Sequence, residues 1–154
     1  LNTGRPLKEG KWLSKFTSNY LDIDNDPLYP FGYGLSYTTF KYGKPTLSSN
    51  TMTNNETISV SVDITNTGNY DADEIAQMYI RDLAASVSRP VKELKGFERI
   101  SIKKGETKTV TFTITPEDLK FYNQELEYKN EPGEFEVMVG PNSKDVQTLT
   151  FTLK

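Results

Sequence analysis

The chain has 154 residues, with 18 Lys and Arg, 21 Asp and Glu, no Cys, no His and a formal net charge of −3. Without Cys it has no disulfide, thiolate nucleophile or iron–sulfur cluster, and without His it has no imidazole acid–base group or Ser-His dyad. The small acidic excess argues against a nucleic acid partner. No apolar run approaches the roughly 20 residues that span a bilayer, so we expect no membrane partner either.

Composition favours strands over helices. The β-branched and aromatic residues that suit a pleated, half-buried surface are common throughout the chain. The apolar share of 35% is low for a compact domain, so we expect one modest core and a stretch that lies outside it. Because the chain begins at Leu1 and shows no leader pattern, we also expect it to be a piece of a longer protein.

The first 36 residues show no lasting strand or helix period, and we predict that they form a linker. Asp22, Asp24 and Asp26 open like a calcium-binding loop. Such a loop needs Gly at its sixth position and Glu at its twelfth, where this chain has Pro27 and Tyr33. We therefore expect no metal and read this run as a solvated acidic linker.

The end of the linker is rich in aromatic residues, with Tyr29, Phe31, Tyr33 and Tyr37 spaced among prolines and glycines. These interruptions rule out a regular strand and predict an extended strap. Its rings have two possible roles. They dock onto this sandwich or a neighbouring domain, which we favour, or they form a stacking platform for sugar rings.

From residue 37 onward the sequence reads as strands joined by turns. Segment 75–83 is apolar on both faces, as expected of a central strand. Clean alternation of apolar and polar residues, typical of half-buried strands, occurs in segments 58–65, 110–114, 135–139 and 149–153.

Three further segments are less regular. Residues 38–47 predict an edge strand, because Pro45 is tolerated only near an edge or an end. Residues 91–102 predict two short strands broken by a bulge or bend around Gly96. Thr115, followed by proline and two acids, predicts a single helical turn through about Tyr122. Together these elements predict an all-β fold, an antiparallel β-sandwich of about seven to eight strands of the immunoglobulin or fibronectin type III kind.

Candidate chemistry is sparse. A glycosidase needs a pair of carboxylates in a cleft, and no acid here stands in a context that marks it, so we predict no catalytic residue and no cofactor. The loop over residues 81–90 places Arg81, Asp82 and Arg89 around small residues. Such a loop suits a polar contact across an interface, and an internal Arg–Asp pair is the alternative.

Several longer sequence motifs resemble the C-terminal end of glycoside hydrolase family 3 enzymes, most closely the periplasmic β-glucosidases of bacteria. Together they cover nearly the whole chain in order, which makes the resemblance specific. The motifs are Asn2–Pro6, Pro27–Thr38, Asn66–Gly68, Ser88–Phe97 and Glu131–Phe135.

The resemblance implies that residues 1–36 are a docking strap after the catalytic domains and that 37–154 form a fibronectin type III-like domain. No residue here matches the family's nucleophile or acid/base motif. It further implies a non-catalytic module that stabilises or docks onto the catalytic domains of the same parent chain, in a periplasmic or secreted β-glucosidase-like enzyme. Tyr29, Phe31, Tyr33 and Tyr37 would pack along that joint, and the 81–90 loop would contact the catalytic domains or a homodimer partner. A carbohydrate-binding module that uses the linker aromatics is the alternative.

Overall fold

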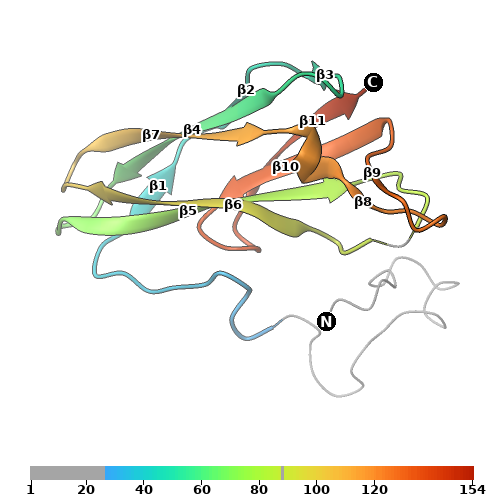
Figure 1. Cartoon of the computed structure of the whole chain (residues 1–154). Coiled ribbons are helices and arrows are strands. Elements are labelled where there is room, and N and C mark those ends of the chain that lie inside the picture. Colours follow the sequence, from blue (N-terminus) through green and yellow to red (C-terminus); the bar gives the residue numbers. More distant parts are fainter. Residues whose placement is uncertain (1–26, 88) are drawn as a thin grey trace, which may run out of the picture.

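A computed structural model describes residues 27–87 and 89–154 of the chain. Figure 1 shows two β-sheets packed face to face, with the segment before β1 running along one side of the sandwich. The acidic run at 22–26 and most of the 1–36 linker lie outside the described residues. In the described ranges, no helix is long and apolar enough to cross a membrane.

The first sheet is built around β4 (Ile58–Asn66). Along one edge of β4 runs β7 (Thr107–Ile114), and along the other edge lie β1 (Phe40–Tyr42) and β2 (Thr46–Leu47), one after the other. The edge strand predicted for residues 38–47 is therefore present as two halves. The interruption falls where Pro45 cannot donate a ladder hydrogen bond.

The second sheet has the order β3-β11-β10-β5-β6. Its central strand β5 (Ala72–Asp82) lies between β10 (Gly133–Gly140) and β6 (Glu93–Ile102), which confirms the prediction of a strand buried on both faces. At the far edge, β3 (Thr51–Met52) runs parallel to β11 (Gln147–Leu153). This pair departs from the wholly antiparallel sandwich that the sequence predicted, because the chain crosses from the first sheet to the second just before β3.

The break predicted near Gly96 is a β-bulge inside one continuous strand, so the predicted bulge is confirmed and the division into two strands is wrong. Met78 of β5 pairs with Gly96 of β6, whereas the next residue, Tyr79, pairs with Leu94, which leaves Lys95 as the extra residue. A Cβ at Gly96 would lie 3.3 Å from the Phe112 ring. The absence of a side chain here lets the strand bulge while the core stays closely packed.

A small hairpin of β8 (Phe121–Tyr122) and β9 (Tyr128–Lys129) lies beside the two sheets. It follows a 3₁₀ turn, Pro116–Leu119, where a helical turn was predicted. Asp118 Oδ2 accepts hydrogen bonds from both the backbone N–H (2.8 Å) and the hydroxyl (2.7 Å) of Thr115, which fixes the start of the turn. The turn ends earlier than predicted because Phe121 begins β8.

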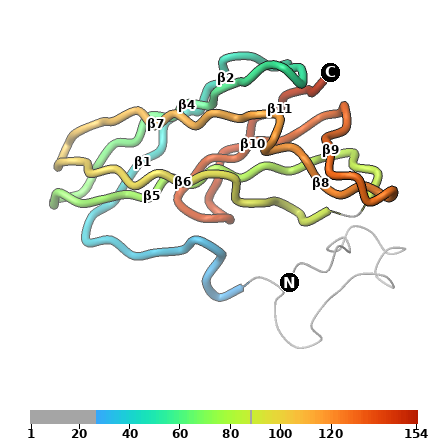
Figure 2. Tube along the Cα trace, viewed as in Figure 1, coloured from blue at the N-terminus to red at the C-terminus, as the bar shows by residue number. Residues whose placement is uncertain are grey.

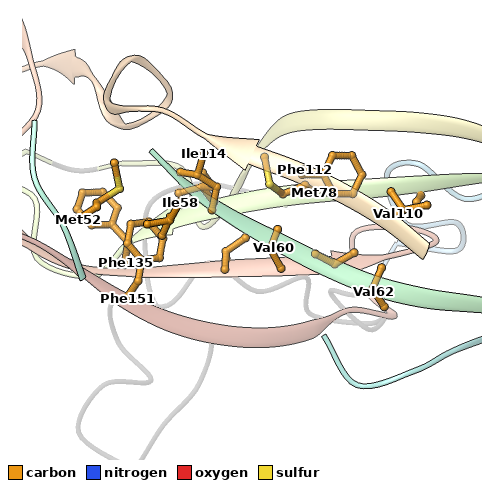
Figure 3. Close-up of a cluster of buried hydrophobic side chains, with 14 of the residues drawn as sticks. Met52, Ile58, Val60, Val62, Met78, Val110, Phe112, Ile114, Phe135 and Phe151 are labelled. Carbon is orange, nitrogen blue, oxygen red and sulfur yellow. The ribbon is translucent and has the colours of Figure 1, made fainter. Parts of the chain in front are cut away.

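The core fills the space between the sheets, as Figure 3 shows. Each apolar residue of the alternating β4 segment is buried, and its polar neighbours face outward. The all-β sandwich fold is thus confirmed. Among the described residues the sheets hold four and five strand segments, close to the predicted number once β1 and β2 are taken as one edge strand.

This packing predicts a sharp contrast between two adjacent positions of β7. Ile114 is fully buried, so Ile114→Ala should lower the free energy of unfolding by about 2–5 kcal/mol through lost burial and a residual cavity. Thr113 points outward, so the near-isosteric Thr113→Val should change it by less than about 0.5 kcal/mol. Urea unfolding of the chain and the two variants measures both, and equal effects would contradict the assigned faces.

Candidate docking surface

The strap, defined here as residues 27–39, is fastened at its C-terminal end by the buried side chain of Asn66. The Asn66 Nδ2 donates to the carbonyl oxygens of Tyr70 (2.8 Å) and Ile102 (2.9 Å). Its Oδ1 accepts from the Thr38 hydroxyl (2.8 Å) and the Gly68 N–H (3.1 Å). The amide thereby uses two donors and two acceptor sites, and one side chain joins the strap to two loops.

The two residues after Asn66 complete this fastening. The Thr67 N–H donates to the carbonyl oxygen of Thr39 (2.9 Å). A Cβ on Gly68 would lie 2.0 Å from the Thr38 hydroxyl oxygen and 2.7 Å from the Thr39 nitrogen, so only glycine leaves room for the strap. The Asn-Thr-Gly motif singled out in the sequence therefore has a local structural role.

A second fastening holds the strap where it crosses the outer face of the five-stranded sheet. The Ser143 N–H donates to the carbonyl oxygen of Phe31 (2.9 Å). The Gln77 Nε2 donates to the carbonyl oxygens of Gly32 (3.0 Å) and Pro141 (2.6 Å). A polar side chain of β5 thus satisfies backbone groups of the strap and of the loop that follows β10.

Beneath the strap lies a small buried layer on the face of β5 that points away from the main core. Tyr79 and its cross-strand neighbour Met138 are buried there, although neither belongs to the core cluster between the sheets. The Tyr79 hydroxyl donates to Gln77 Oε1 (2.5 Å), and the Phe31 ring meets the Tyr79 ring edge-on at 6.5 Å. Burial raises the pKa of the Tyr79 phenol. Figure 2 follows the strap across this side of the sandwich.

The strap aromatics themselves remain exposed to solvent. Tyr29 is 64% exposed, Phe31 66%, Tyr33 43% and Tyr37 95%. The Tyr29 and Tyr33 rings contact each other at 5.2 Å but are tilted by 35°, so they form no flat platform. Docking onto this chain's own sandwich, one of the two docking sites that the sequence allowed, leaves these four rings largely uncovered. The backbone is held while the rings stay available.

The exposed apolar surface continues from the strap onto the edge strand β6 and the residues just before it. Val91, which precedes β6, is exposed, and so are Leu94 and Phe97 of β6, Phe97 by 69%. Sequence reasoning missed these residues, because an uninterrupted strand would put Leu94 and Phe97 on opposite faces. The bulge at Lys95 returns both to the outer face. The one available signal was Gly96, which marks the bulge.

The loop predicted as an interface contact has two of its three charged residues, Asp82 and Arg89, turned inward. Arg89 Nη1 lies 3.8 Å from Asp82 Oδ2, and Arg89 Nη2 lies 2.7 Å from Glu93 Oε1. The Arg89 guanidinium also lies over the Phe121 ring at 4.5 Å. The side chains of Arg89 and Asp82 are only 12% and 4% exposed. The loop therefore contains the internal Arg–Asp pair that the sequence left as the alternative.

Arg81 differs from the other two charged residues of this loop. It pairs with Glu136 on the neighbouring strand at 3.5 Å, and its side chain is 44% exposed. Arg81 is the member of the predicted trio that presents charge to solvent. Elsewhere in the described ranges, no group of three or more acidic side chains is placed to hold a metal ion.

The strap fastening predicts different outcomes for two neighbouring glycines. Gly32 has φ +78°, and a Cβ there would lie 2.0 Å from Gln77 Oε1, whereas nothing lies within 4 Å of a Cβ at Gly34. Gly32→Ala should therefore loosen the strap and destabilise the chain by about 1–2 kcal/mol. Hydrogen exchange at the Ser143 amide should accelerate in Gly32→Ala and stay unchanged in Gly34→Ala. Unaltered exchange in both variants would contradict the described contact.

The ion pairs of Glu93 with Arg89 and Lys95 predict how the free energy of unfolding changes in acid. Burial raises the pKa of the Glu93 carboxyl, but hydrogen bonds from Arg89 and Lys95 lower it by more, so the pKa lies below its ordinary value. The resulting stabilisation is complete above the ordinary pKa of about 4.3 and is lost as the pH falls through the lowered value. Between pH 6.5 and pH 3, Glu93→Gln should lose less unfolding free energy than the unmodified chain. Equal losses in urea titrations would refute this.

Fold and sequence comparisons agree on the class of the domain. Residues 74–143 match the family described as "Fibronectin type III-like domain", and the all-β sandwich fold agrees with this match. The chain is 53% identical over 153 residues to the periplasmic β-glucosidase of Salmonella typhimurium, a match that covers 99% of this chain and 20% of that protein. It is 47% identical over 150 residues to a β-xylosidase of Formosa agariphila, covering 96% and 21%.

Solved structures give the same result. The β-glucosidase of Listeria innocua in complex with isofagomine superposes with a TM-score of 0.88 at 43% identity, covering 99% of this chain and 21% of that one. The chain thus spans about a fifth of the length of these relatives. It resembles the C-terminal part of glycoside hydrolase family 3 enzymes over nearly its full length.

Proposed function

We propose that this chain is a non-catalytic module of a β-glucosidase-like family 3 enzyme and that it stabilises the catalytic domains of the same parent chain by docking onto them. The observation that supports this most directly is the strap. Its backbone is fastened at residues 31–32 and 38–39, yet its four aromatic rings are exposed. Exposed apolar groups on a fixed backbone are typical of a surface that another folded part covers.

Fastening the strap favours docking for a physical reason. A partner that meets a preformed backbone does not have to order it, so less conformational entropy is lost on association. Aromatic side chains add large contact areas with few rotatable bonds. In this proposal residues 1–36, which include most of the strap, form the docking segment, and residues 37–154 form the fibronectin type III-like domain. The active site lies in the remainder of the parent.

The activity that we propose for the parent is supported by its relatives. The Salmonella typhimurium protein is named a periplasmic β-glucosidase, which supports hydrolysis of terminal β-D-glucosyl residues in a periplasmic or secreted enzyme. The 81–90 loop provides a second contact, with the catalytic domains or with a homodimer partner. In that contact Arg81 presents its charge, while Asp82 and Arg89 hold the loop in shape.

The docking role predicts a position-dependent effect in the full-length parent. Replacing Tyr29, Phe31 and Tyr33 together by Ala should lower the parent's Tm, because the contacts of these rings with the catalytic domains are lost. Tyr122 and Tyr128, comparably exposed on the β8–β9 hairpin, give a matched control whose double Ala variant should leave the Tm unchanged. Differential scanning calorimetry measures both. Equal shifts, or no shift even when residues 37–154 are deleted, would overturn the proposal.

Two assays on the 154-residue chain separate the other functions. No nitrophenol should be released from an aryl β-glucoside, and release would make the module catalytic. Calorimetry against cello-oligosaccharides should show no heat of binding. Binding that is lost in Tyr29→Ala or Tyr33→Ala would instead make the strap a carbohydrate-binding surface.

A further inference from the structure

A groove lies beside the strap on the outer face of β5 and β6. It encloses about 450 Å³ and is mostly apolar, with one charged side chain in its wall. It is lined by Pro27, Phe31, Tyr79, Val91, Lys92, Leu94 and Ser143. Because Pro27 and Phe31 belong to the strap, this groove is continuous with the docking surface proposed above.

The β-bulge gives the groove its apolar wall. It places Leu94 opposite Tyr79 on the outer face and leaves Phe97 on the same face further along β6. Together with Phe31 and Val91 these side chains form an exposed apolar surface across the strap and the sheet edge.

Lys92 is the charged residue in this wall. Its Nζ donates to the carbonyl oxygen of Ser143 (2.5 Å). Glu136 is the acid whose charge acts on Lys92, but its carboxylate is already paired with Arg81. Within residues 27–87 and 89–154, Lys92 takes part in no ion pair, whereas the nearby Lys95 pairs with Glu93 at 3.0 Å. Burial lowers the pKa of Lys92, Arg81 lowers it further, and Glu136 opposes both.

A half-buried ammonium without an ion pair is poorly compensated, and an incoming carboxylate would relieve it. We propose that the groove receives a segment of the parent's catalytic part, upstream of Leu1, in which an Asp or Glu lies among apolar residues and pairs with Lys92. This inference rests on the proposed docking function and names the chemistry of the partner surface. A charge pair within an apolar rim fixes the register of two docked surfaces, because a misplaced carboxylate would lose its partner.

Zero-length cross-linking of the full-length parent with a water-soluble carbodiimide tests this directly. The reagent activates a carboxylate as an O-acylisourea, and an amine in contact with it displaces the urea to form an amide. Peptide mass spectrometry should find Lys92 joined to an Asp or Glu upstream of Leu1. This link should disappear in Lys92→Arg, which keeps the charge but lacks the amine. The Lys120–Glu117 pair, at 2.6 Å, provides an internal positive control.

Each other result overturns the inference. A link from Lys92 to a carboxylate within residues 1–154 assigns the groove to this chain itself, and a link between two chains assigns it to a second copy. No link from Lys92 while Lys120–Glu117 forms shows that no carboxylate reaches the groove.

Charge reversal gives an independent measurement. Lys92→Glu should lower the parent's Tm more than Lys41→Glu, the same charge change at an exposed site on β1. Equal shifts would again overturn the inference. The strap and deletion variants report on docking without involving Lys92, so docking can hold while this assignment of the groove fails.

Discussion

Two carboxamides hold an irregular segment against a regular sandwich, and the exposed surface of the molecule depends on them. A strap that crosses a sheet face buries peptide groups that no ladder satisfies. Gln77 donates to the backbone carbonyls of Gly32 in the strap and Pro141 in the loop after β10. Asn66 accepts from the Thr38 hydroxyl of the strap while it donates to the carbonyl oxygen of Ile102. Each buried amide is itself saturated or nearly so, which avoids the penalty of an unpaired polar group.

The strap in turn changes what the outer face of β5 can be. Tyr79 and Met138 would be exposed on a bare sheet, but under the strap they form a second buried layer. The strap thus covers one apolar surface and presents another, since Phe31 contacts Tyr79 with one edge and remains mostly in solvent. Because the strap buries Tyr79 beneath it but leaves its own rings in solvent, a domain with a modest core has several exposed aromatic residues.

Sequence reasoning succeeded where one local pattern decides the outcome. The alternation around Ile58–Ile64 and the doubly apolar β5 identified their strands, because burial on a sheet follows a period of two. The strap was also recognisable, since prolines and glycines among aromatics exclude a strand. The predicted helical turn after Thr115 followed from capping chemistry, which acts over a few residues.

The errors arose where tertiary packing decides the outcome. The face of Leu94 depends on a bulge that forms because Gly96 packs against Phe112, a contact between the two sheets. For Arg89 the sequence left an outward contact and an internal pair open. Packing decides between them, because Glu93 and the Phe121 ring, which is distant in sequence, receive its guanidinium. A polar loop composition is compatible with either direction. Nothing in the sequence of β5 distinguishes Gln77, because its role depends on a contact with Gly32, which is distant in sequence.

The distribution of charge pairs connects these observations to docking. Around the 81–93 loop the cations find partners within the chain: Arg81 with Glu136, Arg89 with Glu93, and Lys95 also with Glu93. Lys92 lies between these pairs yet faces the apolar groove, where its contact is a backbone carbonyl. Bulge, strap and loop together therefore place a cation beside exposed apolar residues. A purely apolar partner would desolvate that cation without compensation, so the surface discriminates in favour of a partner that brings its own carboxylate.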